Sequence, residues 1–509
     1  MSSSISRRAT LVSLAGSAVL MGTACSTSRS ASSVAPAPDT LRLAPTRFEK
    51  QTVSVGGQSI EVRAYLGVPY VAKPVDAAYQ VINIYVPEAY YQNAKVGDFD
   101  ARTAPVFFPN QVGGYMPAKP GTAQAATQGP SAGKPSTIAA ALLKGFVVAS
   151  PGARGRTLKD ANGAFTGKAP AAIVDLKAAV RYLRLNASVL PGDMEKIISN
   201  GTSAGGALSA LLGASGNSPD YEPYLQAIGA APGRDDIFAV SAYCPITNLE
   251  HADAAHEWLF NGVNDYRAIQ MSMLDFNMVR KEVAGTLTPE QIKVSNELKP
   301  LFPAYVNSLK LKSPQGQSLT LDAAGNGSFK DWVMGHVLSS AQAQVDAGKD
   351  MSTYSWLSVQ GGKVRSLDFE AFVRYAGRMK LPPAFDALDA SSGENNLFGT
   401  PSTDNRHFTD FSVQRNTANG AVRAEDKLVK MMNAMRYIGS ADARNAKRWR
   451  IRHGTIDRDT SLAIPVILAT TLQNQGYAVD FAMPWDQGHA GDYDLEQLFA
   501  WMVQVARSS

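Results

Sequence analysis

The sequence has few cysteines and histidines, a small charge excess and no long apolar run. Its 509 residues include two cysteines and six histidines. Cys25 falls in a leader segment described below, so Cys244 is left alone, which excludes a disulfide within one mature chain and a cysteine-rich zinc site. We interpret Cys244, which ends the apolar stretch FAVSAYC, as an inert core thiol.

Charge is nearly balanced, which also narrows the possible partners. The 49 Lys and Arg exceed the 44 Asp and Glu by five, and Arg7 and Arg8 of the leader supply two of these. So mild an excess gives no reason to expect a nucleic-acid partner. A hydrophobic content of 45% is ordinary for a globular protein. The length exceeds what one compact core usually takes, so we expect a large insertion or a second domain.

Residues 1–25 have the organisation of an export signal. Residues 1–24 contain no acid, and Arg7-Arg8 precede the moderately apolar run TLVSLAGSAVLMG, which is short for a membrane span. The stretch SRRATL is typical of twin-arginine signals, and GTAC resembles a lipoprotein box that would lipidate Cys25. We predict export to the periplasm, outer membrane or medium, by simple cleavage or with a lipid anchor at Cys25. Residues 26–45 fit a flexible tether.

From about residue 50, strand-like and helix-like runs alternate. Strands are predicted at SIEVRAYL, YQVINIYVP, APVFFPN, GFVVASPG, KIISN and DIFAVSAYCPI, with a helix at AAIVDLKAAVRYLRLNA. The alternation returns after residue 435 with RWRIRHG, SLAIPVILATTLQNQG, YAVDFAMPW and DLEQLFAWMVQVAR. This pattern predicts an α/β core, at 46–251 and 436–509, with a mostly parallel sheet covered by helices on both faces.

Residues 252–435 interrupt the alternation. The stretches MLDFNMVRKEVAG, PEQIKVSNELKPLF, FKDWVMGHVLSSAQAQVDAG and SLDFEAFVRYAGRMK are polar and helix-like, without clear strand periodicity. We therefore predict a large, mainly helical lid over the ends of the strands.

Residues 201–206, GTSAGG, lie between the strand KIISN and a small-residue helix, ALSALLGAS. Gly-x-Ser-x-Gly in that context is the nucleophile elbow of the α/β-hydrolase fold, in which glycines permit a tight turn that exposes the serine. Ser203 is the predicted nucleophile, and the N–H of Ala204 at the helix start is a predicted oxyanion donor. Gly113 or Gly114, in the loop FFPNQVGGY, is expected to supply the second donor; the alternative is a plain flexible loop.

A serine nucleophile needs a base, and in this fold the order along the chain is Ser, acid, His. His489 lies between the last predicted strand and the last helix, and Asp457 follows the strand before. We predict a Ser203–Asp457–His489 triad; the alternative for His489 is a surface-loop histidine. Asp459 is the rival carboxylate, with an alternative role as N-cap of the next helix. Such acyl transfer needs no metal and no organic cofactor.

The chain resembles one family, the bacterial tannases (tannin acyl hydrolases) of the lactobacillus type. The resemblance covers most residues from about 50 onward, and it is carried by GTSAGG at 201–206, PNQVGGYMP at 109–117, RHGTIDRDTSLAIP at 452–465 and GHAGDYDL at 488–495. It implies an α/β-hydrolase fold and hydrolysis of galloyl ester and depside bonds of tannins, with release of gallic acid. It also implies the triad predicted above. Many relatives lack the export leader.

The resemblance further implies galloyl-binding residues. The family's Lys and Glu, 14 positions apart in the insertion, fall on Lys380 and Glu394, and its Asp two positions after the triad Asp falls on Asp459. Carboxylates accept hydrogen bonds from ring hydroxyls, and an ammonium donates to them. Alternatively, Lys380 and Glu394 are solvated lid residues.

Two rival functions remain open from the sequence. One is a general carboxylesterase or feruloyl-type esterase of the same fold, which shares the triad but lacks residues that bind ring hydroxyls. The other is a surface-displayed binding protein on a hydrolase fold that has lost catalysis.

Overall fold

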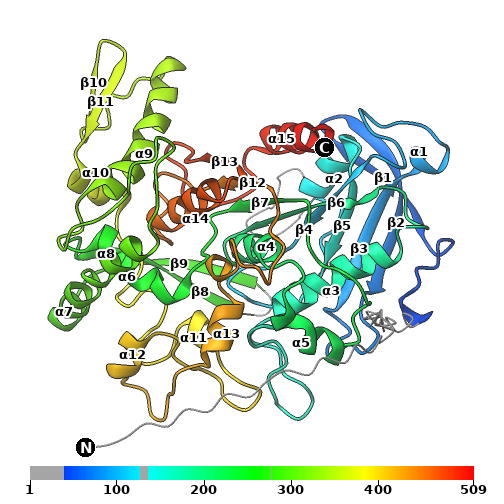
Figure 1. Ribbon diagram of the computed structural model, residues 1–509, viewed down its shortest axis with the longest axis horizontal. Coiled ribbons are helices and arrows are strands. Elements are labelled where there is room, and N and C mark those ends of the chain that lie inside the picture. The colour runs from blue at the N-terminus through cyan, green and yellow to red at the C-terminus, as the bar shows by residue number, and fades with distance from the viewer. Residues whose placement is uncertain (1–38, 126–135, 275–276, 509) are drawn as a thin grey trace, which may run out of the picture. The chain divides into compact units, whose positions relative to one another are not determined.

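The computed structural model of this chain describes residues 39–125, 136–274 and 277–508 (Figure 1). The predicted export signal, with Arg7, Arg8 and Cys25, and most of the predicted tether lie outside the described residues. None of the described helices combines the length and the apolar character that crossing a membrane requires.

A nine-stranded sheet forms the centre of the fold, in the order β1-β2-β3-β5-β4-β6-β7-β12-β13. Strands β1 to β3 and β5 pair antiparallel, whereas β5, β4, β6, β7, β12 and β13 run parallel. The mostly parallel sheet predicted from the sequence is thus confirmed. Its strands are β1 (Glu49–Val55), β2 (Gln58–Pro69), β3 (Val81–Pro87), β4 (Pro105–Pro109), β5 (Val147–Pro151), β6 (Asp193–Thr202), β7 (Ala239–Tyr243), β12 (Arg448–Arg452) and β13 (Ala478–Ala482).

The central strands are buried along their whole length and mainly apolar because both faces of the sheet are covered. Every residue of β4, β5 and β7 is buried, which is the pattern of parallel strands with helices on both sides. The core's helices are α1 (Glu88–Tyr91), α2 (Thr137–Leu143), α3 (Ala171–Leu185), α4 (Ala204–Ala214), α5 (Glu222–Ala227), α14 (Ala463–Asn474) and α15 (Leu495–Arg507), with 3₁₀ turns η1 (Asp39–Leu41), η2 (Pro219–Tyr221) and η3 (Ala434–Arg436).

The inserted region is mostly helical and has its own aromatic core. Trp258, Phe302 and Phe329 pack against one another, in a cluster that also contains Ile464 and Ile467 of α14. The insertion is therefore packed on the core helix that follows Asp457. Its helices are α6 (Leu249–Phe260), α7 (Pro289–Leu298), α8 (Leu301–Ser308), α9 (Ser328–Asp346), α10 (Phe369–Ala376), α11 (Gly393–Leu397), α12 (Asp410–Gln414) and α13 (Asp426–Met431).

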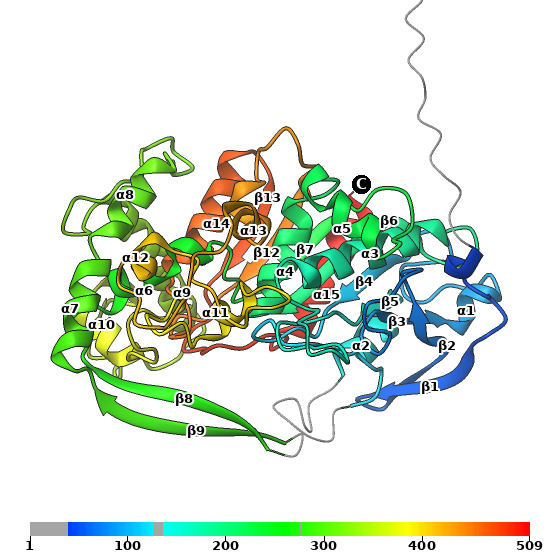
Figure 2. The ribbon, with the colours of Figure 1, turned by 90° about the horizontal axis from the view of Figure 1, so that it is seen from below.

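The region is mainly helical, as predicted, but the helix-like interpretation of one of its stretches is wrong. Strands β8 (Asp265–Leu274) and β9 (Asn277–Thr286) form a long antiparallel hairpin, which runs along the lower edge of Figure 2, and β10 (Leu357–Gln360) and β11 (Lys363–Leu367) form a short one. The helix-like interpretation of MLDFNMVRKEVAG fails because exposure alternates with a period of two: Val283 and Gly285 are partly buried, and Glu282, Ala284 and Thr286 are exposed.

The parallel strands bring the loops at their carboxyl ends to one edge of the sheet. The loop after β4 contains Gly113 and Gly114, β6 leads into Ser203, and β7 into Cys244. Strand β12 is followed by Asp457 and β13 by His489. In an open α/β sheet this edge is where ligands bind, so the order of the strands alone assembles the predicted site.

Candidate active site

Ser203 sits in a strained turn between β6 and α4. Its backbone has φ 61° and ψ −125°, in the left-handed half of φ space that residues with a side chain rarely adopt. The Ser203 N–H donates to the Tyr243 carbonyl at 3.0 Å, which ties the turn to the end of β7. A Cβ on Gly205 would lie 2.6 Å from the Val112 carbonyl oxygen, so this position must be glycine. The predicted nucleophile elbow is present.

Asp457 and His489 form a hydrogen-bonded pair. His489 Nδ1 lies 2.8 Å from Asp457 Oδ2, and the aspartate side chain is fully buried whereas 26% of the histidine side chain is exposed. Burial alone would raise the pKa of Asp457, but the neighbouring imidazoles of His489 and His453 hold it well below its usual range. Burial would lower the pKa of His489, but Asp457 raises it well above the usual value. The pair therefore favours a carboxylate beside an imidazolium.

The loop that carries His489 packs against the residue before Ser203. A Cβ on Gly491 would lie 1.8 Å from the Thr202 hydroxyl oxygen, so glycine is required for this approach. Cys244 Sγ donates to the Ala490 carbonyl at 3.3 Å from the other side. Within the described residues, the Ser203 hydroxyl makes no hydrogen bond to His489. That contact is often formed only once substrate binds.

The predicted oxyanion loop is held against the elbow by Asn110. Its amide nitrogen donates to the carbonyls of Asn200 and Gly205 at 3.1 and 3.0 Å, and its amide oxygen accepts from the Val112 N–H at 3.2 Å. The loop after β4 is therefore fixed to the turn that carries Ser203. The N–H of Ala204, in the first turn of α4, has no partner within the helix and is available to an oxyanion.

Gly113 and Gly114 lie in a tight turn on this loop. Gly114 and Tyr115 have φ 54° and 55°, and the Met116 N–H donates to the Gly113 carbonyl at 2.9 Å. Positive φ at both central residues is the geometry of a type I′ turn, which a glycine adopts without strain. Arg156 fixes the turn's outer peptide, because its Nε donates to the Gly114 carbonyl at 2.8 Å.

Lys380 and Asp459 meet beside the Asp457–His489 pair. Lys380 Nζ donates to Asp459 Oδ1 at 3.1 Å and lies 3.8 Å from the centre of the Phe385 ring. About a quarter of each charged side chain is exposed, 23% for Lys380 and 26% for Asp459, so both can reach a bound molecule. Asp459 does not cap the next helix: the N-cap of α14 is Leu462. The alternative role considered for Asp459 is excluded.

Glu394 lies in the first turn of α11, close enough to interact with Lys380 and Asp459. Burial raises the pKa of Glu394 and Asp459 adds to this, while Lys380 opposes both; the net pKa is raised. Burial would also raise the pKa of Asp459, but Lys380 and His489 hold it below its usual value. The three predicted ring-binding residues are thus brought together, from two segments of the insertion and from the loop after β12.

Buried charged networks beneath the site hold Lys380 and Glu394 in place. Arg378, two residues before Lys380, is fully buried and makes two hydrogen bonds to Glu257, at 2.8 and 2.6 Å. Asn395, next to Glu394, donates to the buried Asp386 carboxylate at 2.6 Å. Breaking such a network would leave a buried charge unpaired, which is costly. The network therefore restrains the backbone next to Lys380 and Glu394.

The sequence did not reveal several neighbours of the site. His453 Nδ1 lies 3.6 Å from Asp457 Oδ2, and Cys244 lies beside the same carboxylate rather than in an unrelated part of the core. The sequence offered one indication of these contacts: His453 lies four residues before Asp457 in the same loop. Asn110 lies in the stretch PNQVGGYMP and Arg156 in none of the quoted stretches, and neither context indicated the contacts that these side chains make.

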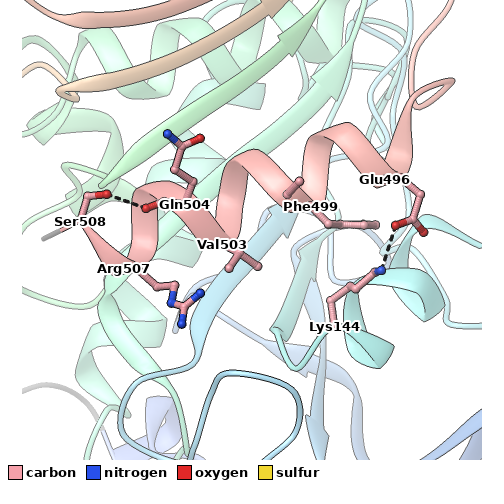
Figure 3. A pocket seen from close by; sticks show the side chains of 8 residues that line it. Lys144, Glu496, Phe499, Val503, Gln504, Arg507 and Ser508 are labelled. Carbon is pink, nitrogen blue, oxygen red and sulfur yellow. Dashed lines mark hydrogen bonds and ion pairs between the residues drawn. The ribbon is translucent and has the colours of Figure 1, made fainter.

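A separate surface hollow of about 600 Å³ lies on the last helix, away from these residues (Figure 3). It is lined by Lys144, Glu496, Phe499, Ala500, Val503, Gln504, Arg507 and Ser508. None of the predicted site residues contributes to it.

Known structures resemble this chain along nearly all of its described length. A tannase from Fusobacterium nucleatum is 52% identical, with a TM-score of 0.87, over 92% of this chain and 99% of that one. The chain belongs to the tannase family. A tannase from Lactobacillus plantarum is 47% identical with a TM-score of 0.88, and a tannin acyl hydrolase solved in complex with ethyl gallate is 47% identical with a TM-score of 0.86, covering 92% of this chain and 100% and 99% of those chains.

Comparisons beyond the tannases indicate the same broader class. A protein-family profile described as BD-FAE matches residues 123–302. Esterase LipQ from Mycobacterium tuberculosis is 33% identical over 90 residues, which span 18% of this tannase-family chain and 20% of LipQ. The chain is an α/β-hydrolase and a carboxylic ester hydrolase, as the sequence predicted.

Proposed function

We propose that this tannase-family enzyme hydrolyses galloyl esters through an acyl-enzyme on Ser203 and releases gallic acid. The observation that carries the proposal is the position of the Lys380–Asp459 pair: Asp459 lies two residues after Asp457, and its N–H donates to the Asp457 carboxylate at 2.9 Å. Groups suited to a polyhydroxylated ring therefore adjoin the groups suited to ester cleavage. A relative solved with ethyl gallate supports this substrate class.

In the first half of the reaction, Ser203 Oγ attacks the ester carbonyl while His489 takes its proton. Asp457 fixes the ring of His489 through the 2.8 Å hydrogen bond to Nδ1, which leaves Nε2 as the base, and stabilises the imidazolium that forms. The negative charge that develops on the carbonyl oxygen is held by the Ala204 N–H and by a second N–H from Gly113 or Gly114.

In the second half, the tetrahedral intermediate expels the alcohol, which takes the proton from His489. A water molecule then gives a proton to His489 and attacks the galloyl-Ser203 ester. Collapse of that intermediate frees gallic acid and returns the hydrogen to Ser203. Every proton passes through His489, and the residues of this chain supply all the groups that these steps use.

Specificity for galloyl esters follows from three residues that we place around the substrate's aromatic ring. Lys380 can donate to a phenolic oxygen, while Asp459 and Glu394 can accept from phenolic hydroxyls. A substrate without those hydroxyls would displace water from the charged groups of these three residues but would offer them no hydrogen-bond partner in its place. Sites built to bind a hydroxyl reject the analogue that lacks it by up to about 10⁴–10⁵-fold.

A comparison of three substrates tests the proposal against a general or feruloyl-type esterase. The kcat/KM is measured for methyl gallate, methyl ferulate and a p-nitrophenyl alkanoate with the same preparation. We expect methyl gallate to be preferred by at least about a hundredfold, the discrimination that a single charged hydrogen bond of up to about 3 kcal/mol provides. Faster turnover of the other two esters would contradict galloyl specificity, and failure to hydrolyse all three would favour a non-catalytic binding role.

We also propose that the enzyme is exported, and that Cys25 is either lipidated or removed with the signal. The support is the sequence pattern of residues 1–25. Metabolic labelling with a radioactive fatty acid distinguishes the two routes: a lipidated enzyme carries label that Cys25→Ser lacks, and a simply cleaved enzyme carries none. Replacement of Arg7 and Arg8 by lysine is expected to block export, and continued export would contradict a twin-arginine signal.

A further inference from the structure

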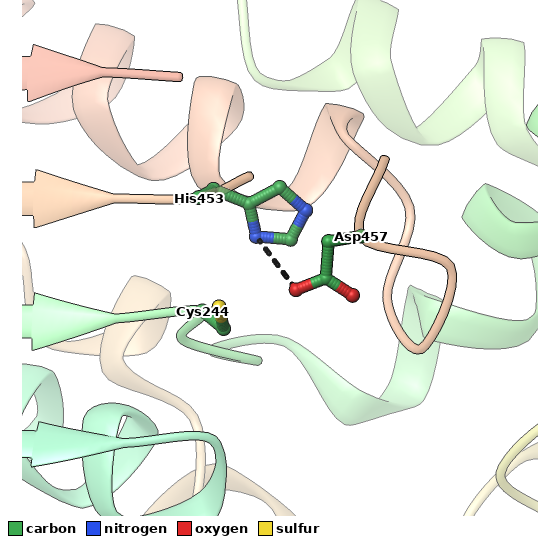
Figure 4. A group of neighbouring side chains, drawn as sticks. All are labelled: Cys244, His453 and Asp457. Atoms are coloured by element: carbon green, nitrogen blue, oxygen red, sulfur yellow. Dashed lines mark ion pairs between the residues drawn. The ribbon is translucent and has the colours of Figure 1, made fainter. Parts of the chain in front are cut away.

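A thiol, an imidazole and a carboxylate meet behind the proposed triad. Cys244 follows β7, and His453 and Asp457 follow β12; one ligand atom from each lies within 4.8 Å of the other two. Figure 4 shows the His453 ring and the Asp457 carboxylate facing each other, with Cys244 alongside. Cys244 and His453 are fully buried and Asp457 is 1% exposed. The three groups therefore face one another and not solvent.

His453 is the unusual member of this group. Both of its ring nitrogens are buried, and neither makes a hydrogen bond of ordinary geometry to a described residue. The 3.6 Å between His453 Nδ1 and Asp457 Oδ2 is longer than a hydrogen bond. A neutral imidazole has a lone pair on one ring nitrogen, and no described residue uses the one on His453. A neutral imidazole with an unused lone pair is the form that ligates metals.

The spacing suits a small tetrahedral cation. Zinc binds imidazole and carboxylate at about 2.0–2.1 Å and thiolate at about 2.3 Å, which places neighbouring nitrogen and oxygen ligands about 3.3 Å apart. His453 Nδ1 and Asp457 Oδ2 are already 3.6 Å apart, so these two groups need to move by only a few tenths of an ångström. Thiolate and imidazole together favour thiophilic d¹⁰ cations over Mg²⁺ or Ca²⁺.

We propose that Cys244, His453 and Asp457 form an inhibitory binding site for a thiophilic divalent cation of the Zn²⁺ class. On binding, the Cys244 S–H bond breaks, a metal–sulfur bond forms and the proton leaves to solvent. Thiolate and carboxylate together balance the charge of the divalent cation.

Inhibition follows because the metal and His489 compete for one oxygen. Asp457 Oδ2 accepts the hydrogen bond from His489 Nδ1 at 2.8 Å, and it is also the oxygen that faces His453. A cation bound to Oδ2 removes the acceptor that orients His489 and stabilises its charged form. This consequence rests on the proposed role of Asp457 in catalysis, whereas metal binding itself does not.

The test is a Zn²⁺ and Cd²⁺ titration of the full chain, wild type and variants. Bound Zn²⁺ is counted by competition with a chromogenic chelator, and bound Cd²⁺ is detected by its ultraviolet thiolate charge-transfer absorption. Activity is followed with a p-nitrophenyl ester, because adjacent phenolic hydroxyls of gallate would themselves chelate the metal. Cys244→Ala and His453→Phe remove one ligand each, and Cys25→Ser, which removes the other thiol in the sequence, is the matched control.

We expect one tightly bound cation, a cadmium–thiolate band, and a loss of activity of at least about a hundredfold that a chelator reverses, since disabling the triad carboxylate costs up to about 10⁴-fold. Cys25→Ser should behave like wild type, and Cys244→Ala should lose both the band and the inhibition. Equal inhibition of Cys244→Ala, or no band in wild type, would overturn the proposal. If wild type hydrolyses no ester while the band appears, the proposed function fails and the metal site stands.

Discussion

Replacement of Lys380 by methionine should reduce the hydrolysis of galloyl esters selectively. Methionine keeps an apolar stem over the Phe385 ring but removes the ammonium that lies 3.1 Å from Asp459. A hydrogen bond to a charged group contributes about 1.5–3 kcal/mol, and the partial exposure of both side chains places this one near the lower end. Because about 1.4 kcal/mol is a factor of ten, we expect kcat/KM for methyl gallate to fall about 10- to 30-fold.

The assay compares methyl gallate with methyl benzoate, which has the same ester but no ring hydroxyls. For methyl benzoate we expect less than about a threefold change, since Lys380 has no phenolic oxygen to contact. Lys330→Met is the matched control: this lysine also lies over a phenylalanine ring, Phe369 at 4.1 Å, but its hydrogen bond goes to Asn326 on the insertion. Equal losses on both esters, or no loss on methyl gallate, would refute the assigned role of Lys380.

Three further predictions concern the catalytic groups. In Gly205→Ala the new Cβ would clash with the Val112 carbonyl, so we expect a loss of at least about 1 kcal/mol in the free energy of unfolding and of most esterase activity, measured by thermal denaturation and ester assay. Because Asp457 raises the pKa of His489 and the base must be neutral, kcat/KM should fall towards acid with an apparent pKa above about 6.5; a limb well below that value would contradict the pairing. Arg156→Gln frees the Gly114 carbonyl, so kcat should drop about tenfold for methyl gallate and methyl benzoate alike, and a loss confined to KM for gallate would argue against a role in the oxyanion loop.

The core of the fold followed from the sequence because its elements carry strong local signals. Buried parallel strands read as continuous apolar runs, and a strand followed by GTSAGG specifies a turn that few other structures use. Placement of Asp457 and His489 needed only the order of two strands and the rule that parallel strands end at the same edge. The insertion was less predictable: β9 contains the polar run Arg280-Lys281-Glu282, which breaks the alternation of apolar and polar residues that marks a strand in sequence.

The contacts within the site depended on information that the sequence does not display. Lys380, Glu394 and Asp459 could be placed by resemblance, but their mutual distance depends on buried networks such as Arg378 with Glu257, whose members are far apart in the chain. Cys244 was interpreted as inert because an apolar strand precedes it. Its position beside Asp457 follows from the pairing of β7 with β12, which becomes visible only in the folded sheet.

The most direct test of the account is capture of the acyl-enzyme. The enzyme is mixed with methyl gallate, quenched in acid within milliseconds, digested and analysed by mass spectrometry, with Ser203→Ala in parallel. We predict a galloyl adduct on the peptide that contains Ser203, formed in wild type alone, and loss of turnover in the variant. An adduct on another residue, or methyl gallate turnover that survives Ser203→Ala, would contradict the central claim that Ser203 attacks the galloyl ester.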